Sequence, residues 1–106
     1  MFELADEYDV AWAVGLFEGE GTFYKGSKSQ SHIRLSMTDL DVVNRFDEIV
    51  NTGIVKLDRT LPSSKNYYRW ECTNVKDIRE ITRRFWPYLG ERRRARAIEL
   101  GINPSN

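Results

Sequence analysis

Residues 13–21 of this chain read Ala-Val-Gly-Leu-Phe-Glu-Gly-Glu-Gly, an apolar stretch that ends in two acids framed by glycines. Ala11 and Trp12 precede the stretch, and a threonine and two aromatic residues follow it. A helix that is apolar on nearly every side must be buried by several neighbours. Carboxylate oxygens at the end of a rigid element suit a divalent cation such as magnesium. The stretch therefore predicts a buried helix with a candidate metal site at its carboxyl end.

Small residues form a stripe along this expected helix. Ala11, Gly15 and Gly19 follow one another at four-residue spacing and so lie on one side. A stripe without large side chains lets another helix approach closely. One interpretation is a central helix within a monomeric core. The other is a symmetric dimer in which two copies of the helix meet, with an interface formed by Ala11, Trp12, Gly15, Leu16 and Gly19.

The bulk properties indicate one small globular domain. The chain has 106 residues, of which 41% are hydrophobic, and this length supports one modest core. A single cysteine, Cys72, excludes an internal disulfide and favours a reducing compartment. No Cys/His cluster suggests zinc, and no apolar run is long enough to span a membrane. We expect an intracellular protein, in a bacterial or phage-infected cytoplasm or in an organelle.

The charges are distributed unevenly along the chain. Residues 1–21 contain six acids and no Lys or Arg, whereas residues 22–106 contain all 16 basic residues and ten acids, a local balance of +6. The net charge of zero does not by itself favour a nucleic-acid partner. An acidic first segment followed by a basic body is nevertheless compatible with one basic face.

Periodicity predicts an α+β domain of two strand pairs and several helices, in which one face of the sheet is apolar and needs the helices. The expected elements are a helix from Asp6 or Asp9 to about residue 18, strands at 22–28 and 32–38 around a turn at 27–31, a helix at 40–50 capped by Asp39, strands at 54–59 and 67–72 around a turn at 61–66, a helix from Val75 that breaks near Pro87, and a last helix at 91–100.

Alternation along the strands places polar side chains on the sheet face that the helices do not need. Lys and Arg on such a face can neutralise phosphates, and a two-stranded ribbon fits the major groove, where polar side chains reach base edges. Asp58 and Glu71 on the same face count against purely electrostatic binding, and an ordinary solvated face is the alternative. The candidate DNA-binding residues are Tyr24, Lys28, His32, Arg34, Ser36, Thr38, Lys56, Tyr67 and Arg69.

Residues 13–21 resemble the signature of the LAGLIDADG homing endonucleases. Gly15, Leu16, Gly19 and Gly21 agree with common family usage, glutamates occupy the two acidic places, and Ala13 stands where leucine is usual. The order of the later elements also matches the family's α+β plan of helix, strand, strand, helix, strand, strand and helix (αββαββα), so the likeness covers about residues 9–100, with the motif helix at about 9–20. The resemblance implies helices packed on one face of a curved antiparallel sheet.

The resemblance implies a function and a set of site residues. It implies a homodimeric, magnesium-dependent (or other divalent-cation-dependent) endonuclease that cuts both strands of a long pseudo-palindromic DNA site. Within the motif it assigns the metal to Glu20, beside Gly19, and leaves Glu18 without an essential role. It also places a basic segment beside the active site, with Arg92 and Arg93 as candidates. A mobile-element role such as intron homing is implied by the resemblance alone.

Other interpretations of these residues remain open. Glu18 and Glu20 are also compatible with solvated or backbone-capping acids, and the Arg92–Arg96 cluster with a solvated helix face. The same fold without cleavage would serve as a DNA-binding regulator or an RNA-splicing cofactor (a maturase). A small interaction protein with no nucleic-acid role is a further alternative.

Overall fold

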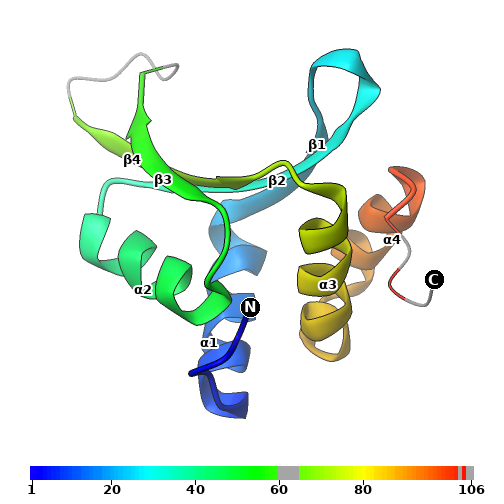
Figure 1. Ribbon diagram of the computed structural model, residues 1–106, viewed down its shortest axis with the longest axis horizontal. Coiled ribbons are helices and arrows are strands. Elements are labelled where there is room, and N and C mark those ends of the chain that lie inside the picture. The colour runs from blue at the N-terminus through cyan, green and yellow to red at the C-terminus, as the bar shows by residue number, and fades with distance from the viewer. Residues whose placement is uncertain (60–64, 103, 105–106) are drawn as a thin grey trace.

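The computed structural model describes residues 1–59, 65–102 and 104. The elements follow the expected order, with a four-stranded antiparallel sheet and its helices gathered below one face (Figure 1). Their bounds are α1 Glu7–Glu20, β1 Gly21–Lys25, η1 Ser27–Ser29, β2 Ser31–Met37, α2 Leu40–Val50, β3 Ile54–Asp58, β4 Tyr67–Cys72, α3 Val75–Phe85, η2 Trp86–Tyr88 and α4 Glu91–Glu99.

The helix α1 starts after Asp6, one of the two expected caps, and ends at Glu20, later than periodicity alone predicted but where the motif helix at about 9–20 was expected to end. Asp6 accepts a hydrogen bond from the backbone N–H of Asp9, whose carboxylate accepts one from Asp6 in return. Such a reciprocal box satisfies two of the free N–H groups at a helix start. At the other end the Gly21 N–H still bonds the carbonyl of Phe17, so the helix continues to Glu20. Gly19 and Glu20 therefore lie in its last turn.

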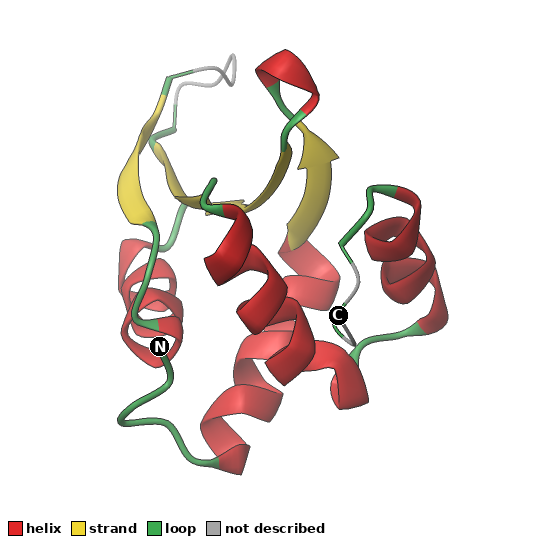
Figure 2. Cartoon of the chain, turned by 45° about the vertical axis from the view of Figure 1, so that its right-hand side comes forward, coloured by secondary structure: helices red, strands yellow, loops and turns green. Residues whose placement is uncertain are grey.

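The sheet has the strand order β1-β2-β4-β3, so the two hairpins meet through the pairing of β2 with β4. Ile33 and Leu35 of β2 and Trp70 and Cys72 of β4 are buried in the core, and they alternate with residues that face the other side of the sheet. Figures 1 and 2 show all four α-helices on that side of the sheet, while the opposite side is curved and uncovered. The alternation expected for 32–38 and 67–72 is confirmed.

Two expected strand ends were too long. β1 ends at Lys25, and Lys28 lies in the short helical turn η1 with a positive φ of 61°. β2 ends at Met37, which leaves Thr38 in a bend before the second helix. Both residues are exposed, but they flank the sheet face and do not belong to its strands. Most of the expected turn at 61–66 lies outside the described residues.

The core joins α1 to the sheet and to the other helices. Phe17 lies against Phe23 and Phe85 with ring centroids 5.2 and 5.9 Å apart, and Phe46 contacts Trp70 at 4.9 Å. These rings are fully buried, and large buried aromatic side chains dominate the stability of a core of this size. No helix in the described residues is both long and apolar enough to cross a membrane.

Two glycines tie the local backbone to this core. Gly53 has a φ of +89°, and a Cβ at this position would lie 2.6 Å from the Trp70 indole nitrogen. Gly21 has an ordinary φ, but an added Cβ would collide with the Phe17 ring. The missing side chain at Gly21 lets α1 pass directly into β1, which fixes where Glu20 projects.

Candidate active site and DNA interface

Glu20 is an exposed carboxylate at the carboxyl end of α1. Within the described part of the chain it makes no hydrogen bond and no ion pair. The preceding Gly19 carbonyl belongs to the last turn, where helix carbonyls have no partner in the helix itself. The end of α1 thus presents a free carboxylate beside backbone oxygen, on an element held rigidly by the burial of Phe17.

Glu18 is engaged in a structural role. Its Oε1 accepts a hydrogen bond of 2.7 Å from the backbone N–H of Gly90, the residue that begins α4. Negative charge at a helix N-terminus interacts favourably with the free N–H groups there. The capping interpretation of Glu18 is therefore the one the structure supports, and this acid joins the end of α1 to the start of α4.

The arginine cluster on α4 is divided between buried and exposed side chains. Arg93 donates from Nη2 to the Glu18 carbonyl at 2.9 Å, and its Nε lies 3.8 Å from the Glu18 carboxylate. Desolvation lowers the pKa of Arg93, with the Glu18 charge acting in the opposite direction. Arg94 donates to the Trp86 carbonyl, whereas Arg92 is exposed without a hydrogen-bond or ion-pair partner among the described residues.

The uncovered side of α1 carries the small-residue stripe. Ala11, Gly15 and Gly19 are exposed, and nothing lies within 4 Å of a Cβ built on either glycine. Tyr8, one helical turn before Ala11, is 87% exposed. The buried side chains of this helix, such as Val14 and Phe17, all face the other way. An apolar helix thus has one side that this chain leaves uncovered, bordered by the half-buried Trp12 and Leu16.

The polar face of the sheet holds a compact ionic network at its centre. Arg69 contacts Asp58 through two hydrogen bonds, Nε to Oδ2 at 3.2 Å and Nη2 to Oδ1 at 2.9 Å. Their side chains are only 11% and 3% exposed. Ser36 donates to the same carboxylate at 3.1 Å. The hydrogen bonds to Asp58 raise the pKa of Arg69, so this cation is held firmly in place.

Glu71 is the second carboxylate of this network. It accepts a hydrogen bond from the Tyr24 hydroxyl and lies 3.5 Å from Arg69 Nη1 and 3.9 Å from Lys56 Nζ. His32 reaches the Tyr24 hydroxyl at 3.1 Å, and the Arg34 guanidinium lies 4.4 Å from the centroid of the Tyr24 ring.

The predicted DNA-binding residues on the strands therefore share one face, as expected. Tyr67 is half-buried there, whereas Lys28 and Thr38 lie beyond the strand ends. Sequence reasoning did not single out two further exposed cations, Arg59 after β3 and Lys65 before β4. Both lie close to the end of a strand, which was the signal available in the sequence, because basic residues at such positions can reach the phosphates on either side of a groove.

The Glu71 network makes stability depend on pH. Burial raises the pKa of Glu71, but the hydrogen bond from Tyr24 and the charges of Arg69 and Lys56 outweigh it, so the pKa lies below the ordinary 4.5. Such a group stabilises the fold above its unfolded pKa, and this contribution is lost as the pH falls through the folded value. Urea unfolding between pH 7 and 3 is expected to show a steeper loss below about pH 4.5 in the wild type than in Glu71→Gln. Equal slopes would contradict the prediction.

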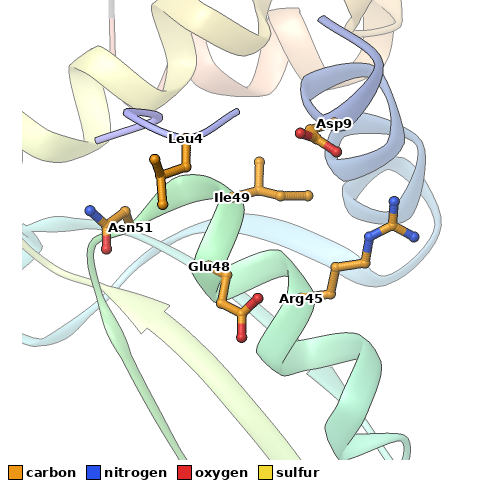
Figure 3. A pocket seen from close by; sticks show the side chains of 6 residues that line it. All are labelled: Leu4, Asp9, Arg45, Glu48, Ile49 and Asn51. Carbon is orange, nitrogen blue, oxygen red and sulfur yellow. The ribbon is translucent and has the colours of Figure 1, made fainter. Parts of the chain in front are cut away.

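A hollow in the surface lies far from these groups. It has a volume of about 390 Å³ and is bordered by Leu4, Asp9, Arg45, Glu48, Ile49 and Asn51 (Figure 3). Asp9 is in the first turn of α1 and Glu20 in its last. At 1.5 Å per residue, the two are separated along the helix by roughly 16 Å. The hollow therefore belongs to the opposite end of the molecule from the candidate active site.

Sequence comparisons give no assignment. No protein-family model and no curated protein sequence matches the chain significantly.

Solved structures do share the fold. The archaeal intron-encoded homing endonuclease I-Vdi141I, complexed with DNA, matches with a TM-score of 0.68 at 15% identity over 83% of this chain and 62% of its own. The group I intron-encoded homing endonuclease I-CeuI, also complexed with DNA, matches at 0.70 and 13% identity over 91% and 53%. I-CvuI, solved with DNA in the presence of magnesium and not cleaving it, matches at 0.64 and 15% identity over 92% and 68%.

The fold is that of homing endonucleases. More narrowly it is the LAGLIDADG fold, since proteins of that type bound to target DNA are among the similar structures. The resemblance carried by residues 13–21 is thereby confirmed at the level of the fold. This chain spans 62% and 53% of the lengths of the first two proteins named above.

Proposed function

We propose that this protein is a homodimeric, magnesium-dependent endonuclease that cleaves double-stranded DNA at a specific site. The observation that carries the proposal is the free, exposed Glu20 carboxylate at the end of a helix whose small-residue side is uncovered. The sheet beside it presents a polar face that no helix covers. Such an enzyme acts where DNA is found, in the cytoplasm or an organelle.

The uncovered stripe supports assembly through α1. Two helices approach most closely where glycines meet, and Gly15 and Gly19 have open space in front of them. A twofold axis beside this stripe would set the two α1 helices next to each other with both Glu20 residues at the same end. Each copy would also contribute one polar sheet face, so the paired surface would match a long DNA site with approximate twofold symmetry.

The residues at the end of α1 fit a magnesium ion. Magnesium binds few protein carboxylates and retains water, and Glu20 has no competing partner in the described residues. No group of three His, Cys, Asp or Glu residues capable of holding a metal occurs in that part of the chain. A metal at Glu20, beside the Gly19 carbonyl, would need further ligands from the second copy, from DNA phosphates and from water. When bound, it would supply Lewis-acid stabilisation to phosphodiester hydrolysis.

The arginines of α4 take different roles in this proposal. Arg92 is exposed and its charge is permanent, so it can hold a DNA phosphate near the reacting bond but cannot transfer a proton. Arg93 is committed to Glu18 and to the end of α1, so it acts as a positioning residue that holds α4 against the site. Of the two arginines, we therefore propose Arg92 as the phosphate contact.

A cleavage assay tests the function. Purified protein is first used to select bound sequences from a random duplex library, and the selected site is then cloned into a plasmid. With magnesium present, the wild type is expected to linearise this plasmid and leave the parent plasmid intact. Selective binding with no cleavage by the wild type would instead support the non-cleaving DNA-binding regulator. Absence of salt-dependent retention on duplex DNA would support the interaction protein.

Gly15 offers a test of the dimer in which folding and assembly change in opposite directions. Within one chain an alanine at this position meets nothing and removes the helix penalty of glycine, about 0.5–1 kcal/mol. Between two chains its methyl group forces the helices apart. Gly15→Ala is therefore expected to raise the dimer dissociation constant at least tenfold, measured by sedimentation, without lowering the thermal stability of the isolated chain. An unchanged dissociation constant would place the interface elsewhere.

A further inference from the structure

Two arginines on the polar face of the sheet are in opposite situations. Arg69 is held between Asp58 and Glu71 and is nearly buried. Arg34 is half-exposed and has no hydrogen bond or ion pair among the described residues. Its guanidinium lies over the ring of Tyr24, with 4.4 Å between the guanidinium carbon and the ring centroid. Arg69 thus uses N–H donors for bonds within the protein, whereas the N–H donors of Arg34 remain available to a ligand.

The register of the sheet places Arg34 opposite a carboxylate, yet Arg34 forms no ion pair with it. Arg34 of β2 is directly opposite Glu71 of β4, the position at which opposite charges pair readily. Glu71 is already occupied by the Tyr24 hydroxyl, by Arg69 and by Lys56. These three partners leave Arg34 to stack on Tyr24. The hydroxyl of Tyr24 thus holds Glu71 while its ring supports the guanidinium.

We propose that Arg34 reads a guanine in the major groove and that Tyr24 is its positioning residue, an inference that rests on the proposed DNA-binding function. A guanidinium has two parallel N–H donors along one edge, and guanine presents two acceptors, O6 and N7, in the major groove. Adenine replaces one acceptor by a donor. Stacking restrains Arg34 to few orientations, so less entropy is lost when the two bonds form.

The remaining charges on the polar face support base recognition by Arg34 and phosphate binding by other residues. Arg69 and Lys56 lie beside Asp58 and Glu71, so the centre of the face offers little net charge for phosphates. The exposed cations Lys28 and Arg59 lie at the ends of the strands. We therefore assign phosphate binding to these flanks and base recognition to the centre. In a dimer, each half-site would carry one guanine read by Arg34.

The first test compares base preference with salt dependence. Sequences are selected from a random duplex library with the wild type and with Arg34→Lys, which keeps the charge but loses the two-donor edge. The wild type is expected to select a guanine at one position per half-site. Arg34→Lys should lose roughly tenfold of that preference, with an unchanged slope of log K against log salt concentration. The matched control, Lys28→Met, should weaken all sites alike and reduce that slope by about 0.9.

The second test addresses Tyr24. Tyr24→Phe keeps the ring but frees Glu71 to pair with Arg34 across the strands, so the guanine preference should fall although Arg34 is intact. Adding Glu71→Gln removes the negative charge that would capture Arg34, and the preference should recover in the double variant. A structural loss alone would not recover in this way, and circular dichroism of each variant checks the fold.

The outcomes separate the inference from the function on which it rests. If Arg34→Met, which removes every donor at this position, selects the same sequences as the wild type with equal discrimination, Arg34 is not the guanine reader and DNA binding still stands. If Tyr24→Phe keeps full discrimination, the positioning role of Tyr24 fails. If the wild type retains no duplex DNA at any salt concentration, the inference and the proposed function fall together.

Discussion

Glu20→Gln is expected to reduce plasmid cleavage by about a thousandfold and to leave DNA binding nearly unchanged. The amide has the size of the carboxylate but lacks the negative charge that holds a divalent cation. Loss of metal-based stabilisation of the transition state costs several kcal/mol, and about 4 kcal/mol corresponds to this factor. The exposed side chain has no structural partner in the described residues, so the fold should persist. Single-turnover cleavage and equilibrium binding to the selected site measure the two effects separately.

Glu18 supplies the matched control for this experiment. The same exchange, Glu18→Gln, lies two residues away but removes a charge that caps α4 at Gly90 and pairs with Arg93. It should lower the free energy of unfolding by about 1 kcal/mol and change cleavage by only a few fold. Equal losses of cleavage in the two variants would show that the end of α1 matters as a charged patch, and the specific role of Glu20 would be refuted.

Asp58→Ala is expected to lower the free energy of unfolding by about 2–3 kcal/mol. The change leaves the nearly buried Arg69 without its principal partner and also removes the acceptor used by Ser36. A nearly buried charge that loses its main partner costs more than the net value of the pair, and Glu71, at 3.5 Å, replaces Asp58 only in part. The face lies at the surface of the sheet and not in the deep core, so the lower end of the range for buried pairs applies. Urea unfolding at pH 7 measures this loss.

A double-mutant cycle separates the cost of the orphaned charge from the value of the ion pair. Arg69→Met alone should also destabilise, because it removes the two hydrogen bonds that the nearly buried Asp58 carboxylate accepts from Arg69. Combining Asp58→Leu with Arg69→Met replaces both charges by apolar groups, an exchange that is often neutral. The double variant is therefore expected to be more stable than either single variant. Additive losses would mean that the two residues do not act as a pair.

Local patterns were sufficient for most of the fold. The alternation of 32–38 and 67–72 predicted which side chains of β2 and β4 enter the core, and the burial of Leu35 and Trp70 confirms it. Asn51 and Gly53 marked the end of α2, and both adopt the positive φ values that make them good stops. Signals of this kind depend on neighbours along the chain, so they can be read without tertiary structure.

The wrong or open predictions concern the ends of elements and the contacts between elements, where the local sequence pattern gives no signal. The polar residues after Tyr24 are compatible with either a strand or a turn, so the strand was expected to continue to Lys28. In the structure, the pairing of β1 with β2 ends at Lys25. Periodicity alone ended the first helix near Glu18, whereas the resemblance implied a motif helix to about residue 20, where the helix does end because the Gly21 N–H still bonds the Phe17 carbonyl. The choice between Arg92 and Arg93 was open because spacing along α4 does not say which one faces α1.

The order of elements, the apolar helix with its stripe of small residues and the difference between the two faces of the sheet could be predicted from the amino acids alone, because each follows from spacing within a short segment. Only in the folded chain does β2 lie beside β4, Arg69 bind Asp58 while Arg34 contacts the Tyr24 ring, and Glu18 cap α4 while Glu20 projects outward. These arrangements join residues distant in the chain. Only the register between paired elements brings their atoms within hydrogen-bonding distance, and no local pattern carries that register.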